Sequence, residues 1–250
     1  MKVTWLSIRR SCETVVHRAS CLGFLILGWH SYAQTPASSE KCDYKSVFGD
    51  RYTEAVMYFA QQPWISDSIA ARGIPPGFAK AIVFPEVIRY SAIRDKLEMQ
   101  GLITLYVQYG VKYSNFSVGR FQMKPSFALQ VEKDARLLPE YQQNVLLGID
   151  TSDTQQARLA RIQRLDSPEW QVLYLITFIK IMDLRYGHAF GSDDPEKLRF
   201  YAAAYNCGYS NNERFIRQKM NENHFHTALF RGEVCYNYGD IATQYYLLSL

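Results

Sequence analysis

Three short segments of the chain carry side chains suited to proton transfer and to hydrogen bonding with a polar ligand. The first reads Ala-Ile-Val-Phe-Pro-Glu and ends at Glu86, the second spans residues 117–125, and the third spans residues 203–208. Glu86 follows an apolar stretch, and burial against apolar neighbours favours the neutral form of a carboxyl group. A glutamate in such a place remains protonated near neutral pH and can act as a general acid.

The other two segments offer groups that could hold a ligand beside that acid. Gly119 has no side chain, so its backbone can come close to a ligand. Gln122 combines a donor and an acceptor on one amide, which matches an N-acetyl group. Tyr205 supplies an apolar ring with a hydroxyl group and Asn206 an amide, which suit a sugar-binding cleft or a support behind the acid. Each feature is common by itself, so the prediction of a site depends on their combination.

Taken as a set, the three segments resemble the motifs of the soluble-type lytic transglycosylases, which are relatives of goose-type lysozyme. In that family a helix ends Ala-Ile-x-x-x-Glu, a second motif reads Gly-Leu-Met-Gln-x-x-Pro, and a third reads Ala-Tyr-Asn-Ala-Gly. This chain keeps the spacing from Ala81 to Glu86, the Gly, Gln and Pro of the second motif, and Ala-Tyr-Asn-x-Gly at 204–208. The order of the motifs also agrees, and the resemblance covers about residues 70–215.

The resemblance implies an enzyme that cleaves the bond between N-acetylmuramic acid and N-acetylglucosamine in peptidoglycan and forms a 1,6-anhydro product. Glu86 would act alone, first as the general acid and then as the base. The substrate-binding residues that the resemblance implies are Ser117, Gly119, Phe121, Gln122, Tyr205 and Asn206. No cofactor and no metal are expected, and the pair His224 and His226 is interpreted as part of a polar loop because no third ligand stands at zinc-site spacing.

The chain departs from the family pattern on both sides of the acid. Val87 stands where the family usually has Ser, and Pro85 would remove a helical hydrogen bond. Two alternatives therefore stay open. One is a hydrolytic muramidase or chitinase-type glycosidase, which needs a second carboxylate to activate water; the other is a catalytically inactive glycan-binding domain of the cell wall. Asp95, Glu98 and Glu132 rank lower as acids, because none ends an apolar helix at the matched position.

The elements that would position these segments are helical. Capping residues and apolar periodicity predict helices over about 50–61, 75–86, 92–109, from 125 onward, 152–165, 167–186, 194–205 and 240–248. The helix that begins at Ser167-Pro168 is apolar on nearly all sides, which is typical of a central buried helix. The segment near residues 114–121, between two predicted helices, is where a small β-hairpin could form. The predicted fold is an all-α, lysozyme-like single domain with a central buried helix.

The N-terminal segment has the pattern of a secretory signal peptide. A basic stretch precedes the apolar run at 21–29, and Ser-Tyr-Ala then precedes Gln34. The expected organisation is a signal peptide over 1–33, a linker over 34–41 and the enzymatic domain over 42–250. The expected location is the periplasm or the exterior of the cell.

Removal of residues 1–33 lowers the net charge from +4 to +1, because four basic residues and one acidic residue lie there. A nearly neutral chain favours neither nucleic acid nor anionic lipid as a partner, and no stable membrane span is expected after signal cleavage. Peptidoglycan strands are the expected partner. Cys42, Cys207 and Cys235 remain, and export would allow one pair to be bridged, with the pairing left open.

Overall fold

The structure is a computed structural model that describes residues 42–90, 96–139, 145–191, 195–226 and 234–249. The predicted signal peptide and linker lie outside the described residues, and Cys42–Leu250 form one compact unit. The prediction of an all-α fold is confirmed, because the described residues form helices and no strand. The hairpin expected near 114–121 does not form there. In its place a single antiparallel bridge joins Val118 to Met123.

The described helices of this unit follow one another along the chain, with the longest connections between α5 and α6, between α6 and α7, and between α10 and α11. They are α1 (Tyr44–Phe48), α2 (Asp50–Ala60), α3 (Pro63–Ala70), α4 (Pro76–Tyr90), α5 (Lys96–Tyr109), α6 (Pro125–Asp134), α7 (Gln155–Asp166), α8 (Pro168–Tyr186), α9 (Pro195–Cys207), α10 (Glu213–Met220) and α11 (Tyr238–Leu248). Short 3-10 turns occur at Ala135–Leu137, Val145–Gly148 and Gly187–Ala189. Within the described residues, no helix combines the length and the apolar character needed to cross a bilayer.

Side-chain caps set where several of these helices begin. The hydroxyl of Ser167 accepts from the backbone N–H of Trp170, and Pro168 occupies the first turn of α8, as the sequence predicts. Helix α7 is capped by Thr154, so it begins slightly later than the predicted start at 152. Helices α1, α3 and α10 were not predicted, although Asn212 caps α10 with an ordinary capping bond to Phe215.

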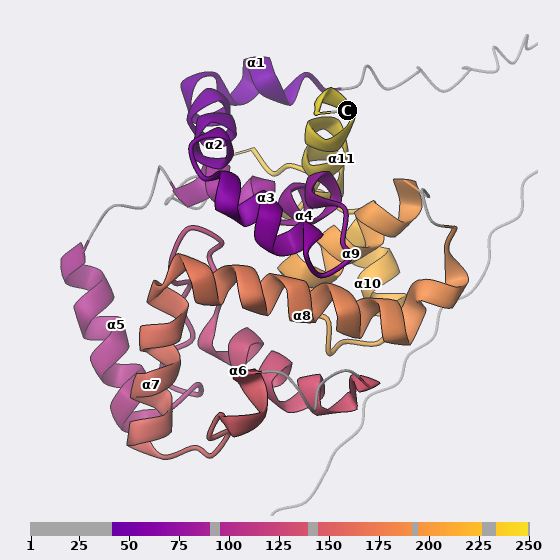
Figure 1. Ribbon diagram of the computed structural model, residues 1–250. Coiled ribbons are helices and arrows are strands. Elements are labelled where there is room, and N and C mark those ends of the chain that lie inside the picture. Colours follow the sequence, from indigo (N-terminus) through magenta and orange to yellow (C-terminus); the bar gives the residue numbers. More distant parts are fainter. Residues whose placement is uncertain (1–41, 91–95, 140–144, 192–194, 227–233, 250) are drawn as a thin grey trace, which may run out of the picture. The chain divides into compact units, whose positions relative to one another are not determined.

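Helix α8 is the central buried helix, as expected from its apolar faces. Residues such as Leu175, Phe178 and Ile181 are fully buried. The helix contacts α3, α4, α6 and α7, and Figure 1 shows it crossing between α3 and α4 on one side and α6 and α7 on the other. The polar side chain of Gln171, also on α8, is buried as well, and it contacts the turn that borders the candidate site.

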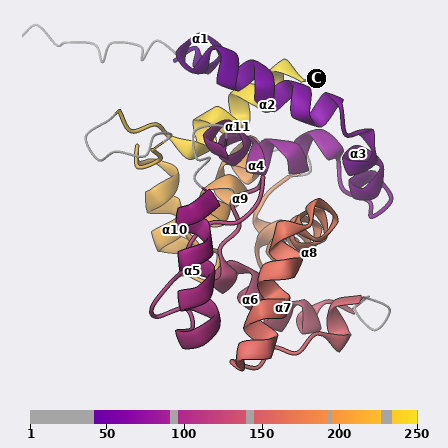
Figure 2. The same cartoon turned by 90° about the vertical axis from the view of Figure 1, so that its left-hand side faces the viewer.

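Helix α4 lies among α2, α9 and α11, as both Figure 1 and Figure 2 show. The ring of Tyr245 stacks on Phe84 with centroids 3.8 Å apart, and Tyr52 meets the same ring edge-on at 4.9 Å. Aromatic pairs in these geometries add to the stabilisation that burial alone provides. Helix α4 is thereby held from two sides, and every residue from Ala81 to Ile88 is buried.

A buried ion network joins α5, α6, α7 and α8. The carboxylate of Glu132 accepts from Arg161 Nε and Arg164 Nη2, each at 2.9 Å, and from the Tyr174 hydroxyl at 2.6 Å. Arg161 also donates to the Tyr106 hydroxyl at 2.9 Å. Glu132 and Arg161 are both inaccessible to solvent. Glu132 is therefore occupied in holding helices together, which removes it from the competing acids.

Replacement of Glu132 by Gln should lower the free energy of unfolding by about 3–5 kcal/mol, because two guanidinium groups lose their buried counter-charge. Urea denaturation measures this loss. Glu213→Gln is the control, since its pair with Arg217 lies at the surface and should contribute little. Equal stability of Glu132→Gln and wild type would show that the guanidinium groups do not depend on this carboxylate.

Candidate functional site

Glu86 lies inside α4 and not at its end, because the helix continues to Tyr90. Only 6% of the residue is exposed, and within the described chain its Oε2 has no hydrogen-bond partner. The nearest cation is Arg89, whose Nη1 lies 3.7 Å from Oε2. Burial raises the pKa of Glu86 to about 7, although the charges of Arg89 and Lys124 act in the opposite direction. The carboxyl group is thus poised to hold a proton near neutral pH.

Pro85 does not end α4, and a neighbouring tyrosine contacts the backbone at this point. A proline in a helix leaves the carbonyl four residues earlier, here that of Ala81, without its usual donor. One residue further on, the carbonyl of Ile82 accepts a hydrogen bond of 3.0 Å from the hydroxyl of Tyr238. Burial, and next the charge of Glu86, raise the pKa of Tyr238. Tyr238 therefore stabilises the helix backbone one turn before Glu86.

The turn from Val118 to Met123 is held tightly by its own backbone. Val118 and Met123 exchange hydrogen bonds of 2.9 and 3.1 Å. Gly119 and Gln122 both adopt positive φ angles, +70° and +49°, and the second is uncommon for a residue with a side chain. The backbone N–H and the Nε2 of Gln122 both donate to the Gly119 carbonyl, at 3.1 and 2.9 Å.

The structure assigns Gly119 a different role from the expected approach to a ligand. A Cβ atom there would lie 1.4 Å from Nε2 of Gln171. That glutamine side chain accepts from the N–H of Phe121 at 2.8 Å and donates to the Leu165 carbonyl at 2.6 Å. The glycine is required because the Gln171 amide occupies the space of its side chain. Gln171 was missed by sequence reasoning, since nothing distinguishes it from a surface glutamine of a helix.

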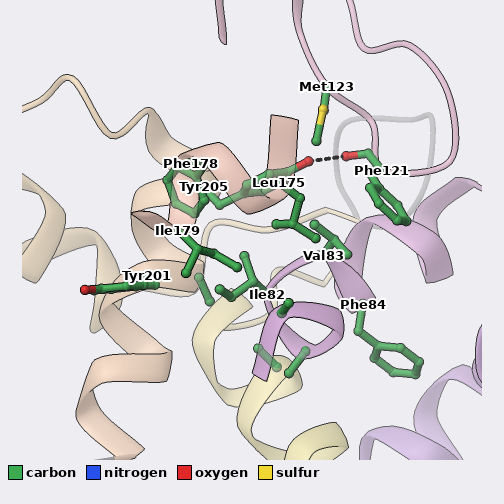
Figure 3. Packing of buried hydrophobic residues seen from close by; sticks show 14 of the residues in the cluster. Ile82, Val83, Phe84, Phe121, Met123, Leu175, Phe178, Ile179, Tyr201 and Tyr205 are labelled. Carbon is green, nitrogen blue, oxygen red and sulfur yellow. Dashed lines mark hydrogen bonds between the residues drawn. The ribbon is translucent and has the colours of Figure 1, made fainter. Parts of the chain in front are cut away.

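Tyr205 fastens this turn to α9. Its hydroxyl donates to the carbonyl of Phe121 at 2.7 Å, the dashed line in Figure 3. Both residues are buried, and the side chain of Phe121 packs in the core. Burial raises the pKa of Tyr205 well above its ordinary value, and the charge of nearby Glu86 adds to that effect. Tyr205 positions the turn beside Glu86. Among the described contacts, no hydrogen bond joins the side chains of Tyr205 and Glu86 themselves.

Arg120 holds the outer side of the same turn. Its guanidinium lies 4.3 Å from the ring centroid of Tyr90 and 5.0 Å from that of Tyr58. Cation–π contacts of this kind contribute about 0.5–1 kcal/mol at exposed sites. The turn is therefore fixed to α2 and α4 as well as to α8 and α9.

A cavity of about 360 Å³ opens beside Glu86, a volume suited to a small ligand. Five of the predicted residues meet on its wall: Glu86, Ser117, Gln122, Tyr205 and Asn206. Gly119 and Phe121 are absent from the wall, because both pack against the side chains that hold the turn. The wall also includes polar residues that the sequence did not single out, among them Arg89, Asn115, Lys124, Ser126 and Gln130.

Glu86 is the one carboxylate among the described residues that line this cavity. Asp95 lies outside the described residues, and so does the side chain of Glu98. Val87, which stands where the resembling family has Ser, is buried in the core and offers no hydroxyl group to the acid. The site thus has one acid and a polar wall.

The cysteines and histidines show no metal-binding cluster within the described residues. No disulfide joins Cys42, Cys207 and Cys235 to one another in the structure, so the bridge left open by the sequence is not formed. Cys207 lines the cavity, and burial raises the pKa of its thiol to about 11. A thiol that is this hard to ionise is a poor nucleophile.

Comparison of the chain with protein-family models, with curated proteins and with solved structures finds no match.

The stability of the protein should depend on pH through Glu86. Its pKa is about 7 in the folded chain against an ordinary value of 4.5, so the stability that the neutral form provides is complete below pH 4.5 and disappears as the pH rises through 7. Glu86→Gln removes this dependence. The unfolding free energy of the variant should therefore gain about 3 kcal/mol on wild type between pH 4.5 and pH 8.

Chemical denaturation at several pH values measures that difference, with exposed Glu54→Gln as the control. A constant difference between Glu86→Gln and wild type across this range would show that the pKa of Glu86 is not raised in the folded chain.

Proposed function

We propose that this protein is an exported lytic transglycosylase that cleaves the bond between N-acetylmuramic acid and N-acetylglucosamine in peptidoglycan. The observation that carries the proposal is the state of Glu86. It is a buried carboxyl group with a pKa raised to about 7, and it is the one carboxylate on the described wall of the cavity. The order of the three sequence motifs supports the same reaction, and the pattern of residues 1–33 supports export.

The proposed reaction uses Glu86 twice. The protonated carboxyl group donates its proton to the glycosidic oxygen while the bond from that oxygen to C1 of the muramic sugar breaks. The resulting carboxylate takes the proton of the 6-hydroxyl of the same sugar, whose oxygen forms a new bond to C1 and closes the 1,6-anhydro ring. Glu86 ends protonated, as it began, and no water is consumed.

The single carboxylate favours this route over hydrolysis. Hydrolases of the two-carboxylate kind hold a second acidic group about 5–9.5 Å from the first, as a nucleophile or to activate water. No second carboxylate lines the described part of the cavity. A reaction in which the sugar supplies its own nucleophile needs none.

The polar wall supplies partners for an acetamido group. Gln122 and Asn206 line the cavity, and one N–H of the Gln122 amide is already held by the Gly119 carbonyl. That bond orients the amide and leaves its oxygen and its second N–H for a ligand. Preorganised groups of this kind bind a ligand with less loss of conformational freedom.

Replacement of Glu86 by Gln should lower turnover by at least the 10²–10⁴-fold typical of a lost general acid and base. The amide has nearly the same shape as the acid but cannot cycle a proton. The assay is release of soluble muropeptides from purified peptidoglycan, with mass spectrometry of the products and Glu54→Gln as a matched control. The products should be lighter by one water than those of hydrolysis.

Each alternative has its own outcome in this assay. Products that contain the added water would identify a hydrolase. Binding of glycan without any release by wild type would identify a catalytically inactive domain. Full activity in folded Glu86→Gln would remove Glu86 from the catalytic role.

A further inference from the structure

Two cationic side chains line the cavity together with the acid. Arg89 is on α4, one turn after Glu86, and 34% of its side chain is exposed. Lys124 is the exposed residue that precedes α6, just after the turn that ends at Met123. With Glu86 they are the only charged residues on the described wall.

The wall of the cavity carries an excess of positive charge when Glu86 is protonated. Arg89 Nη1 is 3.7 Å from Glu86 Oε2, which is beyond hydrogen-bond distance, so the pair interacts through charge alone. A proton on Glu86 removes the negative charge. The cavity then presents two positive charges, while the remaining polar residues on its described wall are neutral.

Arg89 is also held in place for an external partner. The ring of Phe225 lies below its guanidinium group, with the centroid 5.9 Å from Cζ. This contact limits the conformations of the side chain without using its N–H donors. No hydrogen bond joins the Arg89 guanidinium to another described residue, and a guanidinium group that lines a cavity in this state is a natural partner for a carboxylate.

We infer that Arg89 and Lys124 bind a carboxylate of the substrate, so that the site selects an acidic glycan over a neutral one such as chitin. This inference rests on the proposed function, because it concerns the substrate of the same cavity. The carboxylate has two sources in peptidoglycan: the lactyl group of an unsubstituted muramic acid, or a stem peptide attached to that group. Both present the same anion to the two cations.

A neutral glycan is disfavoured by the same arrangement. It would displace water from both cations without providing a counter-charge, and desolvation of an unpaired charge costs free energy. The acidic glycan avoids that cost. Selectivity of this kind arises from the difference between the two complexes, and does not require tight binding of either.

The test measures binding to the full chain carrying Glu86→Gln, so that no ligand is consumed. The probes are a tetrasaccharide of alternating N-acetylglucosamine and N-acetylmuramic acid with free lactyl carboxylates, the same compound with those carboxylates converted to amides, and the same compound bearing stem peptides. The N-acetylglucosamine tetramer is the neutral reference. Titration calorimetry gives each Kd, and thermal melts verify folding.

The free acid should bind about tenfold more tightly than its amide, because charged hydrogen bonds exceed neutral ones by that order. Arg89→Gln and Lys124→Gln should each reduce this preference about three- to tenfold by weakening the binding of the acid, and neither should weaken the binding of the amide. Lys133→Gln, an exposed cation on α6 outside the cavity, is the matched control and should change nothing. Preference for the peptide-bearing form over the amide would identify the stem peptide as a source of the carboxylate.

Equal affinity for the acid, the amide and the peptide-bearing form would overturn the inference, and so would equal weakening of all probes by the two cation variants. The failure of the proposed function looks different. Wild type would then release no muropeptides while the preference for the acid remained. Cleavage by wild type without that preference would refute the role of the cations alone.

Discussion

Burial of a carboxyl group without a hydrogen-bond partner lowers the stability of the folded state. The packing around α4 must therefore provide enough stabilisation to offset the cost of burying Glu86. The stacked rings of Phe84 and Tyr245 and the bond from Tyr238 to the Ile82 carbonyl hold the helix against its neighbours. If the helix could tilt toward solvent, water would reach the carboxyl group and its pKa would return toward the ordinary value. The raised pKa of Glu86 therefore depends on the packing that holds α4 in place.

The chain contains a second buried glutamate that shows how environment decides the role of this residue type. Glu132 receives hydrogen bonds from two arginines and a tyrosine, so its negative charge is matched and its position is fixed. Glu86 has one cation at 3.7 Å and no donor among the described residues. The first arrangement suits a structural link between helices, and the second suits a group that must gain and lose a proton.

The sequence predicted the local features of this site better than the contacts between distant segments. The cap of α8 and its buried character follow from patterns within short windows. The grouping of Glu86, Gln122 and Asn206 at one cavity was expected only from the resemblance of the three motifs to those of a known family. Gly119 and Phe121 do not line the cavity, and the sequence did not reveal their contacts with α8 and α9. Tyr238 was missed for the same reason: its partner Ile82 is 156 positions away, and the chain has 18 tyrosines.

That same distance has a consequence for the order in which the protein acquires its properties. Contacts between residues far apart in the chain form late, because a long loop must close before they can stabilise anything. Tyr238 of α11 is near enough to Glu86 for the two groups to affect each other's ionisation, so the enclosure of this carboxyl group is incomplete until α11 docks on α4. A partly folded chain therefore holds the acid in its ineffective, negatively charged form at neutral pH. Under the proposed function, competence for proton transfer therefore arrives only with the closing of the tertiary structure, and an incompletely folded molecule would leave the glycan intact.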